Sequence, residues 1–564
     1  MRALLATPQK LPVLLAISAG IAVLFCLSLF DLPFLAGTSA FWNNPRGLIA
    51  HSWGDMSTSL SGLLYFEQDR WRLPLFRVAK LAAPAGTNVI VTDSVPLLAL
   101  LARVLFRLTG ETINPFGAWT ACCFIGSALS FTWLVALLGR RTPVEALAAT
   151  AIALTMPVLL YRWGHLALLA QFEIVLALAL YVHARRTTRP AANTLAAFAL
   201  CAASLWTQIY LFLMVGGILA ASLIQAAFDR RERPATAAIK LAAMAVLVLV
   251  LGKISGHFDL PGPASAEGFG LFSLNLLSPI VPQRSGLVPS MAGLVLDGTG
   301  GQYEGFSYLG GSVLLLLAFA APSLARQGRQ RWRGHIALLL VLAGFAAVAV
   351  TNDVYLGPWR VLHIPLPHTL VALAGVVRSS GRFIWPLLYL ATALAIARAS
   401  RLGVVRGAAL LLAAIVLQWV DTAPLRAALS ASIAAPAAAP MPPALLNAAI
   451  SANRMITVLP SYACLQALEG PSKEITVQVQ LAAARLNVAT NTLYAGRAAP
   501  NCDREAARTS LPAAGSGEAT LYLPEYQAFA ALRALAASRP DCQAGRAYLL
   551  CGLPPSDGRY PTKG

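Results

Sequence analysis

Charged side chains are scarce in this sequence, and acidic ones are the scarcest. Of 564 residues only 12% are charged, with 24 Asp and Glu against 43 Lys and Arg, while 57% are hydrophobic. A soluble domain of this size could not bury so much apolar surface in one core. The net charge of +19 would suit a nucleic-acid partner, but the arginines gather in short connectors between apolar runs. That pattern is typical of topology determinants at a membrane face, so we expect no nucleic-acid partner.

Glycine-rich phosphate loops of the usual kind and paired CxxC motifs are also missing, which disfavours a nucleotide substrate and a zinc site. Half of the eight cysteines fall in apolar runs, where a thiol behaves as a small apolar residue. These are Cys26, Cys122, Cys123 and Cys201. The other half fall in the C-terminal tail and indicate two disulfides in an oxidising compartment. The spacing favours Cys464–Cys502 and Cys542–Cys551 among three possible pairings.

What the sequence does contain is apolar runs of about 17–25 residues, each long enough to cross a hydrocarbon core of roughly 30 Å. The first has no convincing small-residue cleavage site after it, so we expect a retained span. The pattern predicts a polytopic α-helical membrane protein with about eleven spans. The approximate runs are Val13–Phe30, Ala118–Leu138, Ala146–Tyr161, Leu166–Val182, Leu195–Trp206, Leu211–Phe228, Ile239–Leu251, Tyr308–Leu324, Ile336–Val350, Phe383–Ile396 and Ala408–Trp419.

The basic connectors also predict an orientation. Arg2 and Lys10 place the N-terminus in the cytoplasm, every inner connector is basic, and every long loop then lies outside. The stretch Val95–Leu108 is apolar but interrupted by arginine, so we expect an interfacial or re-entrant helix there. An odd number of spans leaves the C-terminus outside.

The composition changes at about residue 422, so we divide the chain into a membrane part, residues 1–421, and a tail, residues 422–564. An Ala/Pro linker, SASIAAPAAAPMPP, opens the tail. The strand patterns RMITVLP, EATLYLP and RAYLLC then alternate with Ala-rich stretches suited to helices. The tail is therefore predicted to be a soluble α/β domain.

The long polar loop after the first run carries the acids of most interest. At its centre, HSWGDMSTS surrounds Asp55 with Trp53 and small hydroxyl residues, and Asp93 follows in TDSVP. A carboxylate on a loop between spans suggests a water-facing active site at the bilayer surface. We predict Asp55 as a catalytic base, because its neighbours leave room for a sugar and offer a ring to stack on. Asp93 is the alternative base or a supporting group, although an acid just before Pro96 could simply cap a helix.

Other polar residues cluster at the same predicted face. In VVRSSGRFIWPLLY, Arg378 and Arg382 are four residues apart, which on a helix places both on one face and suits a phosphate, or a lipid headgroup. Glu304, in QYEGFSYLG, could orient a sugar hydroxyl, join a metal site or act as a helix N-terminal acid. His165 and Gln171, in YRWGHLALLAQFE, are polar at the membrane boundary, where such groups are costly, although His165 could also cap a turn.

These features resemble GT-C-type membrane glycosyltransferases, which take a sugar from a polyprenyl-phosphate carrier at the outer membrane face. The shared features are a basic N-terminus, one span, a long outer loop with an early Asp, many further spans and an outer tail. DMSTSLSGLLYF, TDSVPLLAL, QYEGFSYLG and RSSGRFIWPLLY are similar to a bacterial family of that class whose members are largely uncharacterised. The Asp-Glu pair of protein mannosyltransferases is absent, because Met56 follows Asp55.

The resemblance implies a GT-C-like catalytic domain in a bacterial inner membrane, with the tail in the periplasm. The donor would be a polyprenyl-phosphate-linked sugar, the acceptor an envelope glycan, lipid or protein, and membrane lipids would surround the spans. Asp55 and Asp93 would be catalytic, and Arg378, Arg382, Glu304, His165, Trp53 and Gln171 would bind substrate. A divalent metal is possible and no other cofactor is expected. The rival interpretations are a lipid or glycan transporter or flippase, which more often shows two matching halves, and a non-catalytic assembly or export partner.

Overall fold

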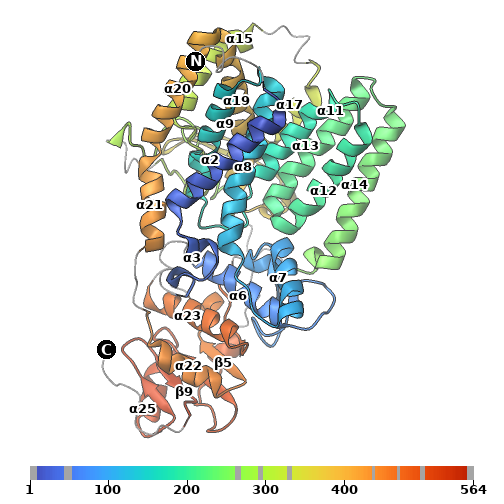
Figure 1. The fold of residues 1–564 in the computed structure, drawn as a ribbon. Coiled ribbons are helices and arrows are strands. Elements are labelled where there is room, and N and C mark those ends of the chain that lie inside the picture. The colour runs from blue at the N-terminus through green and yellow to red at the C-terminus, as the bar shows by residue number, and fades with distance from the viewer. Residues whose placement is uncertain are drawn as a thin grey trace.

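The computed structural model describes residues 9–43, 54–260, 268–289, 296–326, 333–434, 439–465, 470–495 and 502–554. Three layers follow one another down the molecule (Figure 1). Long helices form a bundle, a thin layer of short helices lies at one end of it, and the C-terminal residues cover that layer. The N-terminus lies at the opposite end of the bundle (Figure 1).

The bundle is mostly helical because its sequence is a series of apolar runs broken by Pro, Gly and Arg. Seven described helical segments are long and apolar enough to cross a membrane: Leu11–Leu29, Phe116–Leu138, Pro143–Tyr161, Ile209–Phe228, Pro234–Ser255, Ser380–Leu402 and Val404–Asp421. Three more are apolar but shorter: Phe172–Ala184, Gly311–Ser323 and Ile336–Val350. A helix also occupies the remaining predicted interval, α12 (Pro190–Thr207). The chain is thus a polytopic helical protein, and the count of eleven spans stays a prediction.

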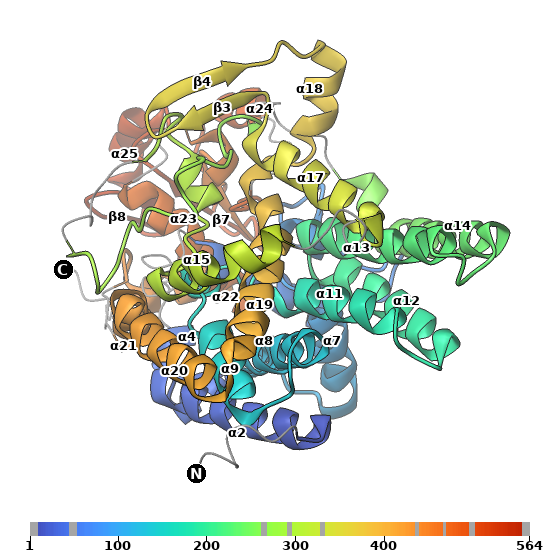
Figure 2. The same ribbon diagram turned by 90° about the horizontal axis from the view of Figure 1, so that it is seen from above.

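In order along the chain, the helices of the bundle are α2 (Leu11–Leu29), α8 (Phe116–Leu138), α9 (Pro143–Leu154), α10 (Pro157–Tyr161), α11 (Phe172–Ala184), α12, α13 (Ile209–Phe228), α14 (Pro234–Ser255), α15 (Gly311–Ala325), α17 (Ile336–Val350), α19 (Trp385–Ala399) and α20 (Val404–Asp421). α12 and α14 lie at one side of the bundle, beside α13 (Figure 2).

One predicted span is broken, which the sequence reading did not foresee. α9 stops at Leu154 and α10 starts at Pro157, because proline has no N–H to continue the helix. The carbonyl of Thr155 instead accepts a hydrogen bond from Gln418 of α20, at 3.2 Å. Arg162 and His165 follow directly after α10.

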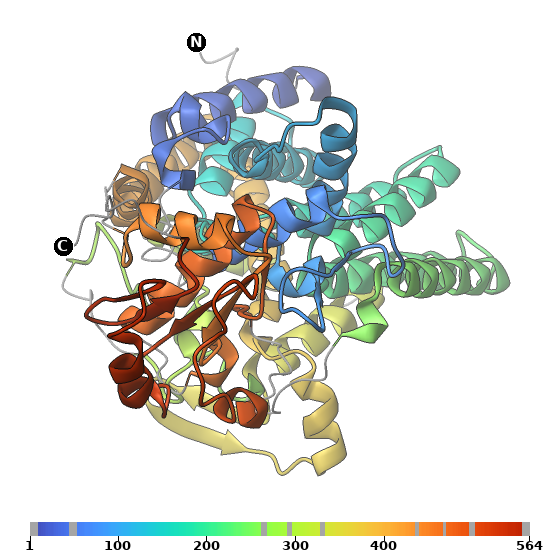
Figure 3. The same cartoon turned by 90° about the horizontal axis from the view of Figure 1, so that it is seen from below.

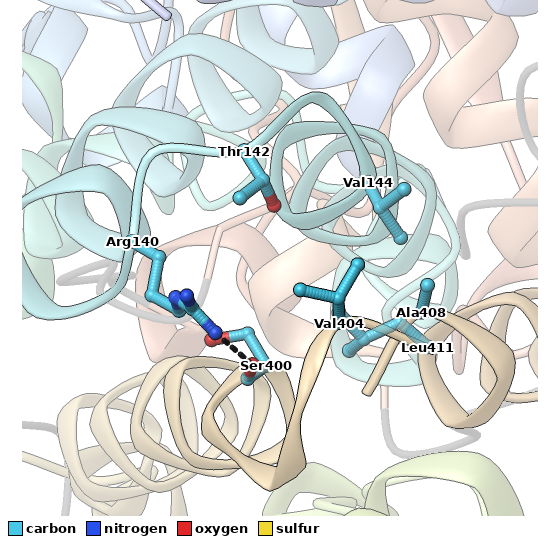
Figure 4. Close-up of a pocket in the computed structure, with 7 residues that line it drawn as sticks. All are labelled: Arg140, Thr142, Val144, Ser400, Val404, Ala408 and Leu411. Carbon is cyan, nitrogen blue, oxygen red and sulfur yellow. Dashed lines mark hydrogen bonds between the residues drawn. The ribbon is translucent and has the colours of Figure 1, made fainter. Parts of the chain in front are cut away.

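The basic connectors meet at the end of the bundle away from that layer. Arg140 donates to the carbonyl of Ser400 at 3.4 Å, and Arg401 donates to that of Leu138 at 2.8 Å. A small pocket lies between these connectors, and Figure 4 shows Arg140 reaching across it toward Ser400. Basic side chains therefore bind helix C-termini there, where the helix dipole favours positive charge.

The short-helix layer is built from the long loop after α2. It contains α3 (Leu32–Leu35), α4 (Ala40–Asn43), α6 (Asp55–Gln68), β1 (Arg77–Val78), β2 (Thr87–Asn88), the 3-10 helix η1 (Val89–Thr92) and α7 (Pro96–Thr109). α7 buries Ala99 and Arg103 on one side and exposes Leu101 and Leu108 on the other. Its 14 residues span about 21 Å, too short to cross a bilayer. The helix predicted between Val95 and Leu108 is therefore present and amphipathic.

The tail forms a mixed five-stranded sheet in the order β6-β5-β7-β9-β8. Its strands are β5 (Met455–Leu459), β6 (Ala489–Thr490), β7 (Glu518–Tyr522), β8 (Cys542–Ala544) and β9 (Leu549–Cys551), and its helices are α22 (Pro443–Ser451), α23 (Pro471–Arg485), α24 (Cys502–Ala506) and α25 (Phe529–Ala536). The three predicted strand patterns correspond to β5, β7 and β9. The structure joins Cys464 to Cys502 and Cys542 to Cys551, the pairing that the spacing favours.

The tail packs closely on the rest of the chain. The stretch after residue 422 begins with a helix, α21 (Ala423–Ala434), although part of it was predicted to be a linker. Leu81 of the long loop pairs in parallel with Thr490 at the edge of the sheet. Tyr65 donates a hydrogen bond to the carbonyl of Val488. One buried hydrophobic cluster runs from the bundle through α6 into the sheet, and Figure 3 shows the tail covering that end of the molecule.

A hairpin projects from the bundle between α17 and α19. Its strands, β3 (Asp353–Leu356) and β4 (Trp359–His363), lead to α18 (His368–Gly375), and all three lie at the rim of the molecule (Figure 2). All of β4 is exposed, with Trp359 at 69%.

Candidate functional site

Asp55 lies where the bundle, the short-helix layer and the tail meet. It is the first residue of α6, and Gly54 precedes it with a φ of 92°, a left-handed conformation that only glycine adopts readily. The side chain of Asp55 is 30% exposed, so water reaches its carboxyl group. The following small residues of DMSTSLSG are buried and let other segments approach the helix closely.

Asp93 is held beside the same helix. Ser59, one turn after Asp55, donates to the carbonyl of Asp93 at 3.2 Å. A Cβ on Gly62 would lie only 2.2 Å from the hydroxyl of Thr92, so this approach requires glycine. Asp93 and the β-branched Val95 both have left-handed φ angles, 55° and 49°. Such strain in a loop is typical of functional sites.

Asp93 ends η1 as its C-cap and is not the N-cap of α7. The residue at the N-cap of α7 is Val95, which makes no side-chain capping bond. The Gln208 side chain, at the start of α13, instead lowers the pKa of Asp93, against the larger effect of burial. The alternative that Asp93 merely caps the following helix is wrong.

A buried charge cluster faces Asp55. His165 Nδ1 lies 3.3 Å from Asp55 Oδ2. Glu304 Oε2 pairs with Arg162 Nη1 at 2.7 Å and with Arg382 Nη2 at 2.6 Å. The Arg162 side chain is 2% exposed and that of Arg382 is 8% exposed. Two guanidinium groups thus share one carboxylate, and the three side chains together carry a net positive charge.

Two glycines bring the members of this cluster together. Glu304 belongs to η5 (Gln302–Gly305) and Arg382 to η6 (Ser380–Ile384), both 3-10 helices. A Cβ on Gly381 would lie 2.6 Å from the Cα of Gly305. The motifs QYEG and SSGR, which lie far apart in the sequence, are therefore in backbone contact, because neither glycine carries a side chain.

Burial and the charges of the cluster shift the pKa values of Asp55 and Asp93. Burial, together with the nearby charges of Asp93 and Glu304, raises the pKa of Asp55 to about 8. Burial also raises the pKa of Asp93 to about 6, although Arg382 opposes the shift. Two acids in one site with separated pKa values are typical of catalytic carboxylates.

The pKa values of Glu304 and His165 are lowered instead. Burial alone would raise the pKa of Glu304, but Arg162 and Arg382 hold it well below its usual range. Glu304 lies in η5, before the start of α15 at Gly311, and its carboxylate is an ion-pair partner of both arginines. Burial lowers the pKa of His165 to about 3, so its imidazole is neutral beside Asp55.

Arg378 does not share a helix face with Arg382, so that prediction is wrong. Arg378 lies in a bend after α18, and η6 begins two residues later. The Arg378 guanidinium is 5.5 Å from the ring of Phe272, whereas that of Arg382 is 4.9 Å from the ring of Tyr210. The i, i+4 argument fails because a tight 3-10 turn replaces the expected α-helix.

The second arginine of the site is Arg162, which the sequence analysis did not select. It follows the broken span and enters the core. A usable signal was present in YRWGH, where an arginine and a histidine together follow an apolar run at the predicted outer face. Tyr494 of the tail packs on Gly54, and Lys473 lies within electrostatic range of Asp55; the site residues predicted from the sequence include neither.

Gln171, a predicted substrate-binding residue, does not join this cluster among the described contacts. Gln171 is buried between helices, where it donates to the carbonyl of Val158 and accepts from the hydroxyl of Tyr389. It connects α10, α11 and α19 beneath the site. Trp53 lies outside the described residues. Within the described ranges, no group of three His, Cys, Asp or Glu side chains could hold a metal ion.

Comparison with known proteins identifies the family but no characterised relative. No curated protein matches the chain. One family, described as a domain of unknown function (DUF6311), matches residues 19–423. The match covers more than half of the chain and includes Asp55, Asp93, Arg162, Glu304 and Arg382, so the chain belongs to the DUF6311 family.

Proposed function

We propose that this protein is a membrane glycosyltransferase that moves a sugar from a polyprenyl-phosphate donor to an acceptor hydroxyl. The observation that carries the proposal is the partly open carboxyl of Asp55 beside a buried pair of arginines. Glycosyl transfer from such a donor needs a base for the acceptor and cations for the leaving phosphate. The likeness of the sequence to GT-C-type enzymes supports the same reaction.

In the proposed reaction the acceptor oxygen attacks the anomeric carbon and loses its proton to Asp55. The bond from that carbon to the phosphate oxygen breaks, and its electron pair leaves with the polyprenyl phosphate. Arg162 and Arg382 stabilise that anion, because guanidinium groups match phosphate oxygens in pairs. Glu304 keeps both arginines in position, and the charge of Asp93 helps to raise the pKa of Asp55.

An apolar cavity of about 350 Å³ between α12, α13 and α14 could take the isoprenoid chain. Its lining is Cys201, Phe212, Leu213, Gly216, Gly217, Leu241, Met244, Ala245 and Val248. Phe212 lies two residues after Tyr210, whose ring contacts the Arg382 guanidinium. A phosphate at the arginines would therefore leave its tail close to this cavity.

The same proposal includes a location. Basic connectors at one end of the bundle favour the cytoplasmic side, which would place Asp55 and the tail at the periplasmic face of a bacterial inner membrane, after eleven spans. The two disulfides support an oxidising compartment for the tail. Reporter fusions at Arg140 and Gly515 test this, with signals expected inside and outside respectively, and a cytoplasmic signal at Gly515 would contradict it.

The function is tested with the whole protein in lipid nanodiscs. Mass spectrometry of co-purified lipid identifies the carrier, and a panel of polyprenyl-phosphate sugars then measures transfer. Asp55→Asn should bind donor normally and lower transfer by about 10²–10⁴-fold, the usual contribution of a general base. Asp353→Asn is the matched control, because Asp353 pairs with Arg360 and His363 in the projecting hairpin.

Two outcomes would change the proposal. Normal transfer by Asp55→Asn together with loss in Asp93→Asn would assign the base to Asp93. Donor movement across the bilayer without any transfer would instead support a flippase.

A further inference from the structure

The side of Asp55 that faces the tail is lined by residues the proposed reaction has not used. Tyr494 packs directly on Gly54, since a Cβ at Gly54 would lie 3.2 Å from the Tyr494 ring. The ring of Tyr462 lies 4.7 Å from that of Tyr494, centroid to centroid. Lys473 Nζ lies 5.5 Å from the Tyr494 ring. Both rings are half-buried, so each keeps a surface toward solvent.

The position of this tyrosine pair relative to Asp55 is fixed by hydrogen bonds. Gln480 of α23 accepts from the backbone N–H of Tyr494 at 2.8 Å. The same amide donates to Thr58 Oγ1, one turn after Asp55 on α6, at 3.2 Å. Tyr462 is tied to the same strand end, because its N–H donates to Thr492 Oγ1 at 3.1 Å. The tail therefore holds two aromatic rings at a defined place beside the carboxyl group.

A third tyrosine comes from the bundle. Tyr303 precedes Glu304 in η5 and is 48% exposed. The charge of Asp55 contributes to raising the pKa of Tyr303, of Tyr462 and of Tyr494, with burial as the largest cause in each case. Aromatic side chains from two different parts of the chain thus lie within electrostatic range of the carboxyl group.

We propose that the C-terminal sheet forms the acceptor half of the site, and that the acceptor is a carbohydrate stacked on Tyr462 and Tyr494. The C–H face of a pyranose suits the electron-rich face of an aromatic ring, and phenol hydroxyls can exchange hydrogen bonds with sugar hydroxyls. Among the described residues, no hydrogen bond uses the hydroxyl of either tyrosine. This inference rests on the proposed function, because it assigns Asp55 as the base for that acceptor.

Two observations favour a carbohydrate over a lipid or a peptide. The tyrosine pair belongs to the tail layer, whereas the apolar cavity suited to a lipid chain lies among α12, α13 and α14. A peptide is commonly bound as an added strand at a sheet edge. The edge nearest the site, β6, is already paired with Leu81.

Binding is tested with the full chain in nanodiscs on an array of bacterial surface oligosaccharides, and the best ligand is then titrated by calorimetry. Tyr462→Leu and Tyr494→Leu should each weaken binding by about tenfold or more, whereas the phenylalanine variants should stay within about threefold of wild type. Trp359→Leu is the control, because Trp359 is an exposed ring on the projecting hairpin. Tyr494→Leu could fail to fold, since its ring packs on Gly54, and Tyr462→Leu then carries the test.

The proposal is overturned if no oligosaccharide binds, if the leucine variants bind as wild type, or if only lipids or peptides depend on the tyrosines. Asp55→Asn separates this result from the proposed function. Retained glycan binding by a variant without transfer supports both statements. Glycan binding by a wild-type protein that shows no transfer would refute the glycosyltransferase but leave the carbohydrate site.

Discussion

Within the charge cluster, replacing Glu304 should lower the free energy of unfolding more than replacing either arginine. It is the common partner of Arg162 and Arg382, both nearly fully buried. Removing one partner of a buried ion pair costs about 3–5 kcal/mol, because the remaining charge is left without compensation. Glu304→Gln leaves two such charges close together, so we expect a loss at the upper end, about 5 kcal/mol.

A double-mutant cycle separates this effect from simple misfolding. Arg162→Met leaves Glu304 paired with Arg382 and should cost roughly 2 kcal/mol less than Glu304→Gln. The combined variant should lose less than the sum of the two, with a coupling energy of about 1–3 kcal/mol. Unfolding is followed by tryptophan fluorescence during denaturation in mixed micelles. Glu111→Gln is the matched control, because Glu111 is exposed.

The same variants test whether the arginines bind phosphate. With its carboxylate gone, Glu304→Gln offers two unneutralised guanidinium groups, so dodecyl phosphate should stabilise it more than wild type. At a ligand concentration of 100 times Kd the gain is about 2.7 kcal/mol. A Glu304→Gln protein within about 1 kcal/mol of wild type, additive double mutants or no effect of dodecyl phosphate would each refute the reasoning.

Four further predictions concern Asp55, a disulfide of the tail and Gly62. Transfer should rise with pH through about 8, because Asp55 must lose its proton to act as base, and the pH–rate profile measures this. Folding raises the pKa of Asp55, so the contribution of Asp55 to the free energy of unfolding is complete below about pH 4 and is lost as pH rises through about 8. Asp55→Asn should therefore raise the unfolding midpoint more at pH 9 than at pH 5. Reducing the Cys464–Cys502 disulfide, which closes 38 residues, should cost about 3.9 kcal/mol in the chain-entropy treatment, as measured by denaturation with and without reductant. Gly62→Ala should destabilise by about 1–3 kcal/mol in the same assay, because its Cβ would collide with the adjoining loop, whereas Gly20→Ala, with nothing within 4 Å, should not.

Much of the helical framework could be predicted from the sequence, because a long apolar run by itself indicates a helix removed from water. The run Ile336–Val350 corresponds residue for residue to α17. The strand patterns of the tail were equally local, and β5 and β7 lie where alternation places them. The missed strands, β6 and β8, have only two and three residues, too few to show a period. The Pro157 break was missed because a proline inside an apolar run can either kink or end a helix.

The site was predictable only in part because it depends on contacts between distant segments. Asp55, His165, Glu304 and Arg382 were selected as ionisable residues at the predicted membrane boundary, a signal that each carries by itself. The prediction that Arg378 and Arg382 share a helix face was wrong because Arg378 lies in a bend and Arg382 in a 3-10 helix. The contribution of the tail depends on Gln480 connecting two layers, which no pattern along the chain reveals.

The contact between α6 and the C-terminal sheet also sets an order of events during synthesis. Tyr65 and Val488, whose hydrogen bond joins the two, are 423 residues apart. At about 5–20 residues per second, roughly 20–85 seconds pass between the emergence of one and of the other. During that time α6 has already left the ribosome but lacks the strand it will pack against. A chain whose translation stops before Val488 would carry its helical bundle but lack the tail contacts of α6 that complete the surroundings of Asp55.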